Sequence, residues 1–220
     1  MVHILIKLKK FIFNYDETGY KIANPPKTAI RLKNSKYTKI KCSDNLKEGY
    51  TFGLTISKGG SFLKPLLITK GKSERCLKKY NLDDSIMGTY NKKGWADENC
   101  IIIILDQISH VTKNEQSLLL MDQYGSHKTQ KVLDYAKSKN INILFIPVGL
   151  TAKYQPLDVS INGILKIKAI KLYSEFIALN PDKKYTHERC INNFLQIKKE
   201  INKGTIIKAF DCLDRSKIVR

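Results

Sequence analysis

Three aspartates stand where core elements of the chain are expected to begin or end. Asp16 follows a strand-like segment at residues 10–15, and Asp122 follows an apolar run at residues 117–121. Asp158, with 35 residues between it and Asp122, starts a helical pattern. If the strands ending at Asp16 and Asp122 are neighbours, both side chains reach one sheet edge. The beginning of the helix then delivers Asp158 to the same point.

Carboxylates gathered in this way would repel one another and would not all stay ionised without a cation. Oxygen ligands with open coordination positions suit Mg²⁺ or Mn²⁺. Two such ions roughly 3.5–4 Å apart can activate an attacking oxygen and stabilise a leaving oxygen at a phosphodiester. We therefore identify Asp16, Asp122 and Asp158 as the candidate catalytic residues and metal ligands, with two Mg²⁺ (or Mn²⁺) ions as the cofactor.

Each aspartate also has a purely structural interpretation. Asp122 and Asp158 both precede predicted helices, where Asp is a favoured N-cap. Asp16 begins the sequence Asp-Glu-Thr-Gly and could shape a turn. Capping does not require three acids to converge, so the structural interpretation is weaker for the set than for any one member.

The elements that must position these acids begin with a series of strands. Besides residues 10–15, strand patterns occur at residues 37–42, 50–56 and 65–69, with turn signals between them. Three antiparallel strands fit this spacing. A helix is then predicted that enters at residues 94–98 and continues over residues 101–111, because Asp97 and Glu98 would lie in its first turn. The run of four isoleucines that begins at Ile101 leaves a strand as the alternative.

The second half of the chain alternates strands and helices. Residues 117–121 and 143–146 are apolar on both faces, as buried strands are. Helices are predicted at residues 127–138 and from Asp158 onward. The resulting order predicts an α/β fold, a mixed sheet flanked by helices that matches the ribonuclease H-like order. We assign residues 1–178 to this domain and residues 179–220 to a basic, helical C-terminal extension.

The acids also lie within motifs that resemble those of a known family. Residues 14–19 (Asn-Tyr-Asp-Glu-Thr-Gly) and 122–127 (Asp-Gln-Tyr-Gly-Ser-His) are similar to the first and second aspartate motifs of pogo-like transposases. This group includes jerky-type and centromere protein B-related proteins and has a DDE superfamily endonuclease domain. Residues 146–158, ending in Gln-Pro-Leu-Asp, resemble the third motif, and the resemblance covers about residues 11–178. Four further features fit the family pattern: Gly71-Lys72, Gly94-Trp95, Asn162 and Lys166.

The resemblance implies an enzyme that cuts DNA at transposon ends and joins them to a target, located in the nucleus. Water or a 3′-hydroxyl would attack the phosphodiester without a covalent enzyme intermediate. Two departures stand out: Gln123 replaces the family's Asn or Ser, and only about a dozen residues precede the first motif, where relatives carry helix-turn-helix modules. The alternative is therefore a remnant or domesticated transposase domain that binds DNA without catalysis. A homodimer is left open.

The net charge of +19 points to the same partner, DNA. Residues 1–80 carry 18 basic and 5 acidic side chains, residues 81–178 carry 11 and 10, and residues 179–220 carry 10 and 5. Basic segments thus flank a nearly neutral middle. The alternative is codon bias, since 34 of the 39 basic residues are Lys, as an AT-rich genome would give.

Several polar residues are candidates for contacts with DNA phosphates. They are Lys70, Lys72, His127, Lys128 and Lys166. For the first two, a solvated loop is the competing interpretation. His127 either reaches the acidic site or bonds to backbone at a helix start.

Other signals favour structural roles or exclude functions. Trp95 is interpreted as a core anchor rather than as a platform for base stacking. Gly71-Lys72-Ser73 imitates a phosphate-binding loop, but Leu66 stands where that loop requires Gly, so no nucleotide cofactor is expected. The five scattered cysteines form no CxxC pair. No apolar run approaches the roughly 18–20 residues of a membrane span.

Overall fold

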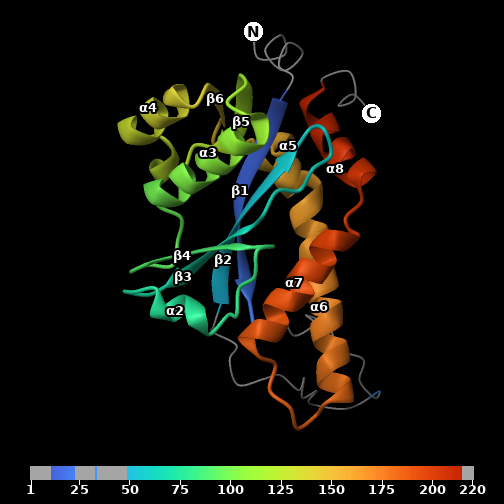
Figure 1. The fold of residues 1–220 in the computed structure, drawn as a ribbon. Coiled ribbons are helices and arrows are strands. Elements are labelled where there is room, and N and C mark those ends of the chain that lie inside the picture. Colours follow the sequence, from blue (N-terminus) through green and yellow to red (C-terminus); the bar gives the residue numbers. More distant parts are fainter. Residues whose placement is uncertain (1–10, 23–32, 34–48, 215–220) are drawn as a thin grey trace.

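The chain folds around one six-stranded mixed sheet with the strand order β4-β3-β2-β1-β5-β6 (Figure 1). This computed structural model describes residues 11–22, 33 and 49–214, so the strand predicted at residues 37–42 lies outside the described residues. The strands are β1 (Phe11–Lys21), β2 (Gly49–Ser57), β3 (Leu66–Lys70), β4 (Met87–Asn91), β5 (Ser117–Asp122) and β6 (Ile141–Ile146).

β1 lies at the centre of the sheet and joins its two halves. It pairs antiparallel with β2, which pairs antiparallel with β3, as the sequence predicted. On its other side β1 runs parallel to β5, with Asn14 beside Leu120, and β5 runs parallel to β6. β1 and β5 therefore run in the same direction toward Asp16 and Asp122.

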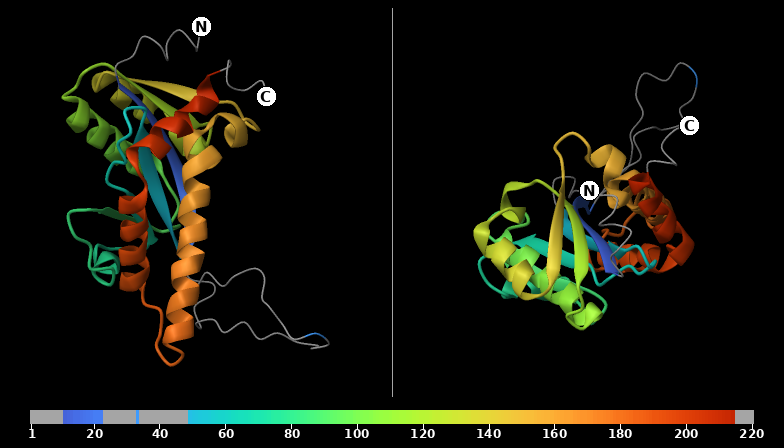
Figure 2. Two further views of the ribbon diagram at one scale, coloured as in Figure 1. Left: turned by 90° about the vertical axis from the view of Figure 1, so that its right-hand side faces the viewer. Right: turned by 90° about the horizontal axis from the view of Figure 1, so that it is seen from above.

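Helices cover both faces of the sheet. Their bounds are α2 (Arg75–Lys78), α3 (Glu98–Thr112), η1 (Gly125–His127), α4 (Gln130–Ser138), α5 (Thr151–Tyr154), η2 (Leu157–Ile161), α6 (Asn162–Leu179), α7 (His187–Glu200), α8 (Lys203–Ala209) and η3 (Phe210–Leu213). Viewed from above, α3 and α4 lie on one side of the strands, and α6, α7 and α8 lie on the other (Figure 2). The predicted α/β fold with a mixed sheet and flanking helices is confirmed.

Side-chain alternation along β1 builds a separate core on each face. Phe13 and Tyr15 belong to the cluster that includes α3 and α4, whereas Ile12 belongs to the cluster that includes α6 and α7. Asn14 and Asp16 share the parity of Ile12. They therefore face the layer of η2 and α6, where the third motif of the chain is located.

The predicted helix over residues 101–111 is confirmed as α3. Asp97 is its N-cap and accepts a hydrogen bond from the Cys100 amide at 3.1 Å. The buried apolar positions recur at i, i+3, i+4 and i+7, which makes one continuous face against the sheet. They are Ile101, Ile104, Leu105 and Ile108.

Two predictions about strands were wrong. Asp16 does not end the first strand but lies in its middle, because pairing with β2 continues as far as Lys21 opposite Gly49. β4 was missed, because Met-Gly-Thr-Tyr-Asn has no clear alternation of apolar and polar residues. It forms nevertheless, as a short edge strand that pairs in parallel with β3.

The helices after α6 pack on the sheet rather than apart from it. Phe194 of α7 stacks on Phe52 of β2 with ring centroids 3.9 Å apart, and it meets Tyr20 of β1 edge to face. The helical character predicted for this segment is confirmed through η3. The domain boundary at residue 178 stays a prediction. None of the helices in the described ranges is both long and apolar enough to span a membrane.

Candidate metal centre

Asp16 and Asp158 meet through the amide of Asn162. The Asn162 Nδ2 group donates to Asp16 Oδ2 at 2.8 Å and to Asp158 Oδ1 at 3.0 Å. Asp16 is 8% exposed and Asn162 is 4% exposed, whereas Asp158 is open to solvent. Two of the three predicted acids thus share one hydrogen-bond donor at a solvent-accessible rim.

Asn14 fixes the backbone around this pair. Its Nδ2 donates to the Leu120 carbonyl of β5 at 3.0 Å, and its Oδ1 accepts from the Leu157 amide at 2.9 Å. One buried side chain therefore ties together β1, β5 and the start of η2. Asp158 lies in η2, a single π-helical stretch, and such stretches are frequent at functional sites. Asp158 is not the N-cap that its structural interpretation required, because Pro156 holds that position.

Burial and neighbouring charge act together on Asp16. Desolvation, then the charges of Asp158 and Glu17, raise the pKa of Asp16 to about 8, against the opposing hydrogen bond from Asn162. Without a cation, Asp16 therefore holds a proton at neutral pH. A divalent cation would reverse this preference, because it stabilises the ionised form of both carboxylates.

Asp122 is the last residue of β5. It lies two residues beyond Leu120, and Asp16 lies two residues beyond Asn14, the partner of Leu120 on β1. Leu120 belongs to the core on the α6 side, so strand alternation places Asp122 on the same face as Asp16. Asp122 Oδ1 accepts from the Tyr124 amide at 3.1 Å and lies 2.7 Å from His127 Nδ1. These contacts lower the pKa of Asp122. Its carboxylate is therefore turned toward η1.

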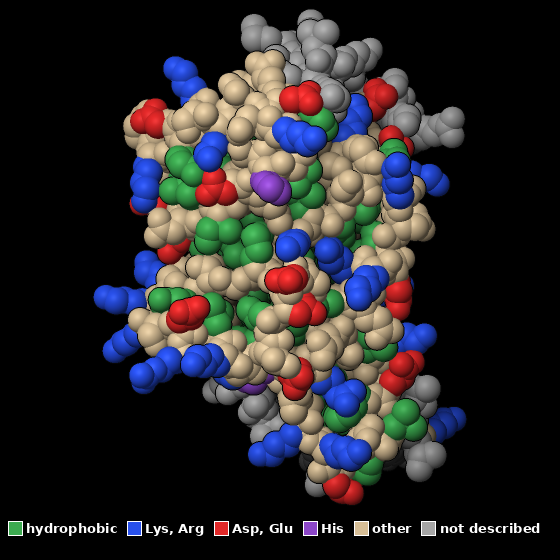
Figure 3. Space-filling model, viewed as in Figure 1, with side chains coloured by type: hydrophobic (Ala, Val, Ile, Leu, Met, Phe, Trp, Pro, Cys, Tyr) green, Lys and Arg blue, Asp and Glu red, His purple; other side chains and the backbone are tan. Residues whose placement is uncertain are grey.

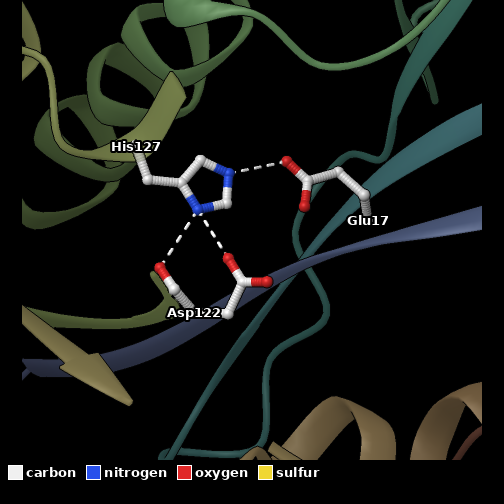
Figure 4. A group of neighbouring side chains, drawn as sticks. All are labelled: Glu17, Asp122 and His127. Atoms are coloured by element: carbon white, nitrogen blue, oxygen red, sulfur yellow. Dashed lines mark hydrogen bonds and ion pairs between the residues drawn. The ribbon is translucent and has the colours of Figure 1, made fainter. Parts of the chain in front are cut away.

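His127 bridges Asp122 to Glu17 (Figure 4). His127 Nε2 lies 2.9 Å from Glu17 Oε1, and Nδ1 also lies 3.2 Å from the Asp122 carbonyl. Burial by itself would lower the pKa of this 1%-exposed imidazole, but the bonds to Asp122 and Glu17 raise it to about 10. His127 thus contacts both the carboxylate and the backbone carbonyl of Asp122, while its contact with a DNA phosphate stays a prediction.

Among the described residues, the ligand atoms of Glu17, Asp122 and His127 lie within 4.8 Å of one another, which is the spacing of a metal site, whereas Asp16 and Asp158 are not part of this group. Both ring nitrogens of His127, however, face carboxylate oxygens. An imidazolium donates from both nitrogens and has no lone pair for a metal. The cation at this position is therefore His127 itself. No pattern in the sequence indicated a role for Glu17 beyond its place next to Asp16.

Comparison with known proteins identifies the family of this chain. The family described as DDE superfamily endonuclease matches residues 47–217, which is well over half of the chain. The chain belongs to this family. The match includes Asp122 and Asp158, while Asp16 precedes it on β1.

A sequence relative of this DDE superfamily endonuclease domain is a pogo-type protein. The human protein named "Pogo transposable element with ZNF domain" is 25% identical over 116 residues, which is 51% of this chain but 8% of that protein. The chain therefore spans only a small part of that relative's length. The resemblance to pogo-like transposases is confirmed as a distant relationship.

Solved structures confirm the ribonuclease H-like fold. A pre-cleavage Mos1 transpososome superposes with a TM-score of 0.53 at 10% identity, over 95% of this chain and 59% of that chain. The Mos1 mariner paired-end complex with Mn gives a TM-score of 0.53 at 11% identity over the same shares. At these identities the likeness speaks for the fold alone.

The remaining candidate residues of the DDE domain are all exposed. Lys70, Lys72, Lys128 and Lys166 are all exposed, so each is accessible to a phosphate. Trp95 was wrongly predicted to be a core anchor. It is 64% exposed and lies on the loop between β4 and α3.

Replacing His127 by Leu is expected to lower the free energy of unfolding by roughly 2 kcal/mol, because two carboxylates lose a charged partner. The loss should be largest below pH 6.5, the ordinary pKa of His, where the imidazolium contributes fully. It should shrink as the pH rises toward 10. Urea unfolding at several pH values measures it. His110→Leu, on the exposed end of α3, is the matched control, and an equal loss in both variants would contradict this role.

Proposed function

We propose that this domain is a metal-dependent DNA endonuclease and strand-transfer domain of a transposase, in which Asp16, Asp122 and Asp158 hold the catalytic ions. The observation that carries the proposal is the buried Asp16 carboxylate beside Asp158, with Asn162 between them. Burying one carboxylate beside a second, exposed one is unfavourable for stability alone. The family and the fold agree with such a role.

The chemistry of these side chains fits Mg²⁺ or Mn²⁺. Three carboxylates offer hard oxygen ligands, and the exposure of Asp158 leaves positions for water and phosphate. Asn162 Oδ1 is buried and accepts no hydrogen bond from the described residues, so this oxygen is available as a further metal ligand. Two similar Mos1 paired-end complexes are with Mn and with Mg. We propose two ions for this chain.

Bound ions would supply an activated attacking oxygen and charge stabilisation for the leaving oxygen. The chain's own residues prepare the site. Asn162 orients Asp16 and Asp158, and Asn14 holds η2 at a fixed distance from β1. His127 binds Asp122 through Oδ1, which leaves Oδ2 available as a ligand. Water or a 3′-hydroxyl would be the nucleophile, so the protein forms no covalent bond to DNA.

DNA is the proposed partner. The similar Mos1 structures include a transpososome and a complex with a transposon end. On the face drawn in Figure 3, Lys and Arg side chains gather around α2 at the lower left. The exposed cations of this cluster are Lys72, Arg75, Lys78 and Lys79.

DNA affinity is expected to fall at least tenfold between about 50 and 200 mM salt, because lysine contacts release counterions from phosphates. Fluorescence anisotropy with a labelled duplex of arbitrary sequence measures this dependence. A flat response to salt would mean that the charge of +19 reflects codon bias and not a DNA-binding surface.

The second candidate function is DNA binding without cleavage, as in a domesticated or remnant transposase domain. One observation favours it: the Asp122 carboxylate is bonded to an imidazolium, whereas Asp16 and Asp158 are bonded to Asn162. Gln123, where relatives have Asn or Ser, adds to this interpretation. The two functions differ in one readout, which is metal-dependent cleavage.

Incubation with supercoiled plasmid separates the two functions. The wild-type protein should nick the plasmid with Mg²⁺ or Mn²⁺ and not with chelator, with Mn²⁺ the more permissive ion if Gln123 disturbs the site. Asp122→Asn should bind DNA and fail to nick. Nicking by both proteins would reveal a contaminating nuclease and remove the support for the triad. Absence of nicking by both, with binding retained, would favour the non-catalytic function.

A further inference from the structure

An open cavity of about 830 Å³ lies next to the candidate metal centre. One wall is the loop that joins β4 to α3, and the other is the turn that follows β5. Its lining includes two lysines, two aromatic residues and a stretch of small residues. These are Lys92, Lys93, Trp95, Tyr124, Gly125 and Ser126.

The two aromatic side chains of the cavity are unusually exposed. Trp95 is 64% exposed and Tyr124 is 57% exposed. Large aromatic residues contribute most to stability when they are buried. The exposure of two of them in one cavity therefore indicates a binding surface for a ligand or a partner. Tryptophan and tyrosine rings can stack on flat groups, and ammonium groups attract anions.

The loop that carries Trp95 is rigidly bonded in this outward position. Asn91 Nδ2 donates to the Trp95 carbonyl at 2.6 Å, and Asn91 Oδ1 accepts from the Gly94 amide at 2.6 Å. Thr51 of β2 donates to the Gly94 carbonyl at 3.1 Å. Gly94 has φ +72°, and a Cβ atom there would lie 3.0 Å from the Lys70 amide nitrogen. The backbone thus favours glycine here and presents the neighbouring indole to solvent.

The acidic residue in the lining is already bonded. Asp97 caps α3 through Oδ1, and its Oδ2 accepts from Asn91 Nδ2 at 3.1 Å. Lys92 and Lys93, in contrast, are both exposed cations of the same lining. The charged groups of the cavity that remain open to a ligand are therefore the two lysine ammonium groups, which suit a phosphate-bearing ligand.

The cavity is joined directly to the proposed catalytic residues. The Tyr124 amide donates to Asp122 Oδ1 at 3.1 Å, and the Tyr124 ring meets His127 edge to face at 5.9 Å. A nucleic acid strand at the metal centre would therefore have its neighbouring nucleotides within reach of this cavity.

We infer that the cavity holds an unpaired nucleobase of the DNA strand next to the scissile phosphate. Trp95 would stack on the base, Tyr124 would close the other wall, and Lys92 and Lys93 would contact adjacent phosphates. Stacking on an aromatic side chain tolerates any base, so the site would distinguish single strands from duplex and not one sequence from another. The inference rests on the proposed function, because the strand is that of the DNA substrate.

Trp95 is the single tryptophan of the chain, so its fluorescence reports on this cavity alone. The full chain is titrated in chelator with a thymidine decamer, with an abasic decamer of equal charge, and with a duplex. The thymidine decamer should quench the emission, and the abasic decamer should quench it little. The variants at position 95 have no tryptophan, so their affinity is measured by the fluorescence anisotropy of an end-labelled thymidine decamer. By this readout Trp95→Ala should weaken binding of the thymidine decamer by about fivefold to a hundredfold, the equivalent of one stacked base. Duplex binding should not change.

Trp95→Phe, which retains a ring, should keep most of the affinity for the single strand. Because Trp95 is exposed, the melting temperature of Trp95→Ala should match that of the wild type, which excludes misfolding. Equal quenching by thymidine and abasic decamers, or unchanged affinity in Trp95→Ala, would overturn the inference. Since no metal is present, these outcomes are separate from the nicking assay: nicking without quenching would reject the cavity and keep the proposed function.

Discussion

The metal-free protein is expected to become more stable when Asp16 is replaced by Asn. In the wild type, burial and the charge of Asp158 raise the pKa of Asp16 to about 8, so its ionised form is costly. An amide at position 16 can accept from Asn162 and donate toward Asp158, which removes the repulsion and keeps the geometry. We expect a gain of roughly 2–4 kcal/mol in the free energy of unfolding at pH 8.

The pH dependence of this gain follows from the sign of the pKa shift. Above pH 8 the wild-type carboxylate is ionised in both the folded and the unfolded chain, so the folded state bears the full cost. The cost declines as the pH falls toward the ordinary value of 3.8, because the folded protein takes up the proton. The stability gap between variant and wild type should therefore shrink on acidification. Denaturant unfolding in chelator at several pH values measures it.

Asp182→Asn is the matched control for this experiment, since it makes the same chemical change on an exposed side chain beyond the far end of α6. It should leave the free energy of unfolding unchanged. Added Mg²⁺ should stabilise the wild type more than Asp16→Asn, because the variant has lost a ligand. An Asp16→Asn protein that is less stable than the wild type without metal would contradict a functional origin for the buried acid.

Replacing Asp158 by Asn should reduce metal-dependent nicking at least a hundredfold, or about 2.7 kcal/mol of transition-state stabilisation. The side chain is exposed, and an amide oxygen at position 158 can still accept from Asn162, so the fold should be unaffected. Only the anionic ligand is lost. Initial rates of plasmid nicking by both proteins, at saturating Mn²⁺, provide the comparison.

DNA binding in chelator should be equal for the wild type and Asp158→Asn, since no phosphate contact is removed. Asp182→Asn should nick at the wild-type rate. Normal nicking by Asp158→Asn would mean that the third motif does not take part in metal binding, and catalysis would then have to depend on Asp122 with Glu17.

The sequence predicted those parts of the site that depend on strong local patterns. Residues 117–121 are apolar on both faces, which identifies a buried strand and makes Asp122 its terminal residue. The helix predicted from Asp158 onward is present, although its first residues form a π-helical stretch and not an ordinary helix start. Hydrogen-bond partners decide between these forms, and no periodicity encodes them.

Features that depend on contacts between distant residues could not be predicted. Glu17 and His127 are 110 positions apart, and only the adjacency of β1 to β5 brings them together. Asn14 and Leu157 are likewise 143 positions apart. β4 was missed because this edge strand forms through pairing with β3, which its own composition does not indicate. The exposure of Trp95, on the loop after β4, likewise could not be read from the local sequence.

The central claim is that Asp16, Asp122 and Asp158 bind the same ions. Anomalous diffraction from crystals of the wild-type protein soaked in Mn²⁺ tests it most directly, because manganese positions appear independently of any assay. Manganese is expected at the carboxylates of all three aspartates, with Asp122 bound through Oδ2 while Oδ1 stays on His127. Manganese bound by Glu17 and Asp122 without Asp16 and Asp158, or no manganese at concentrations that support nicking, would contradict it.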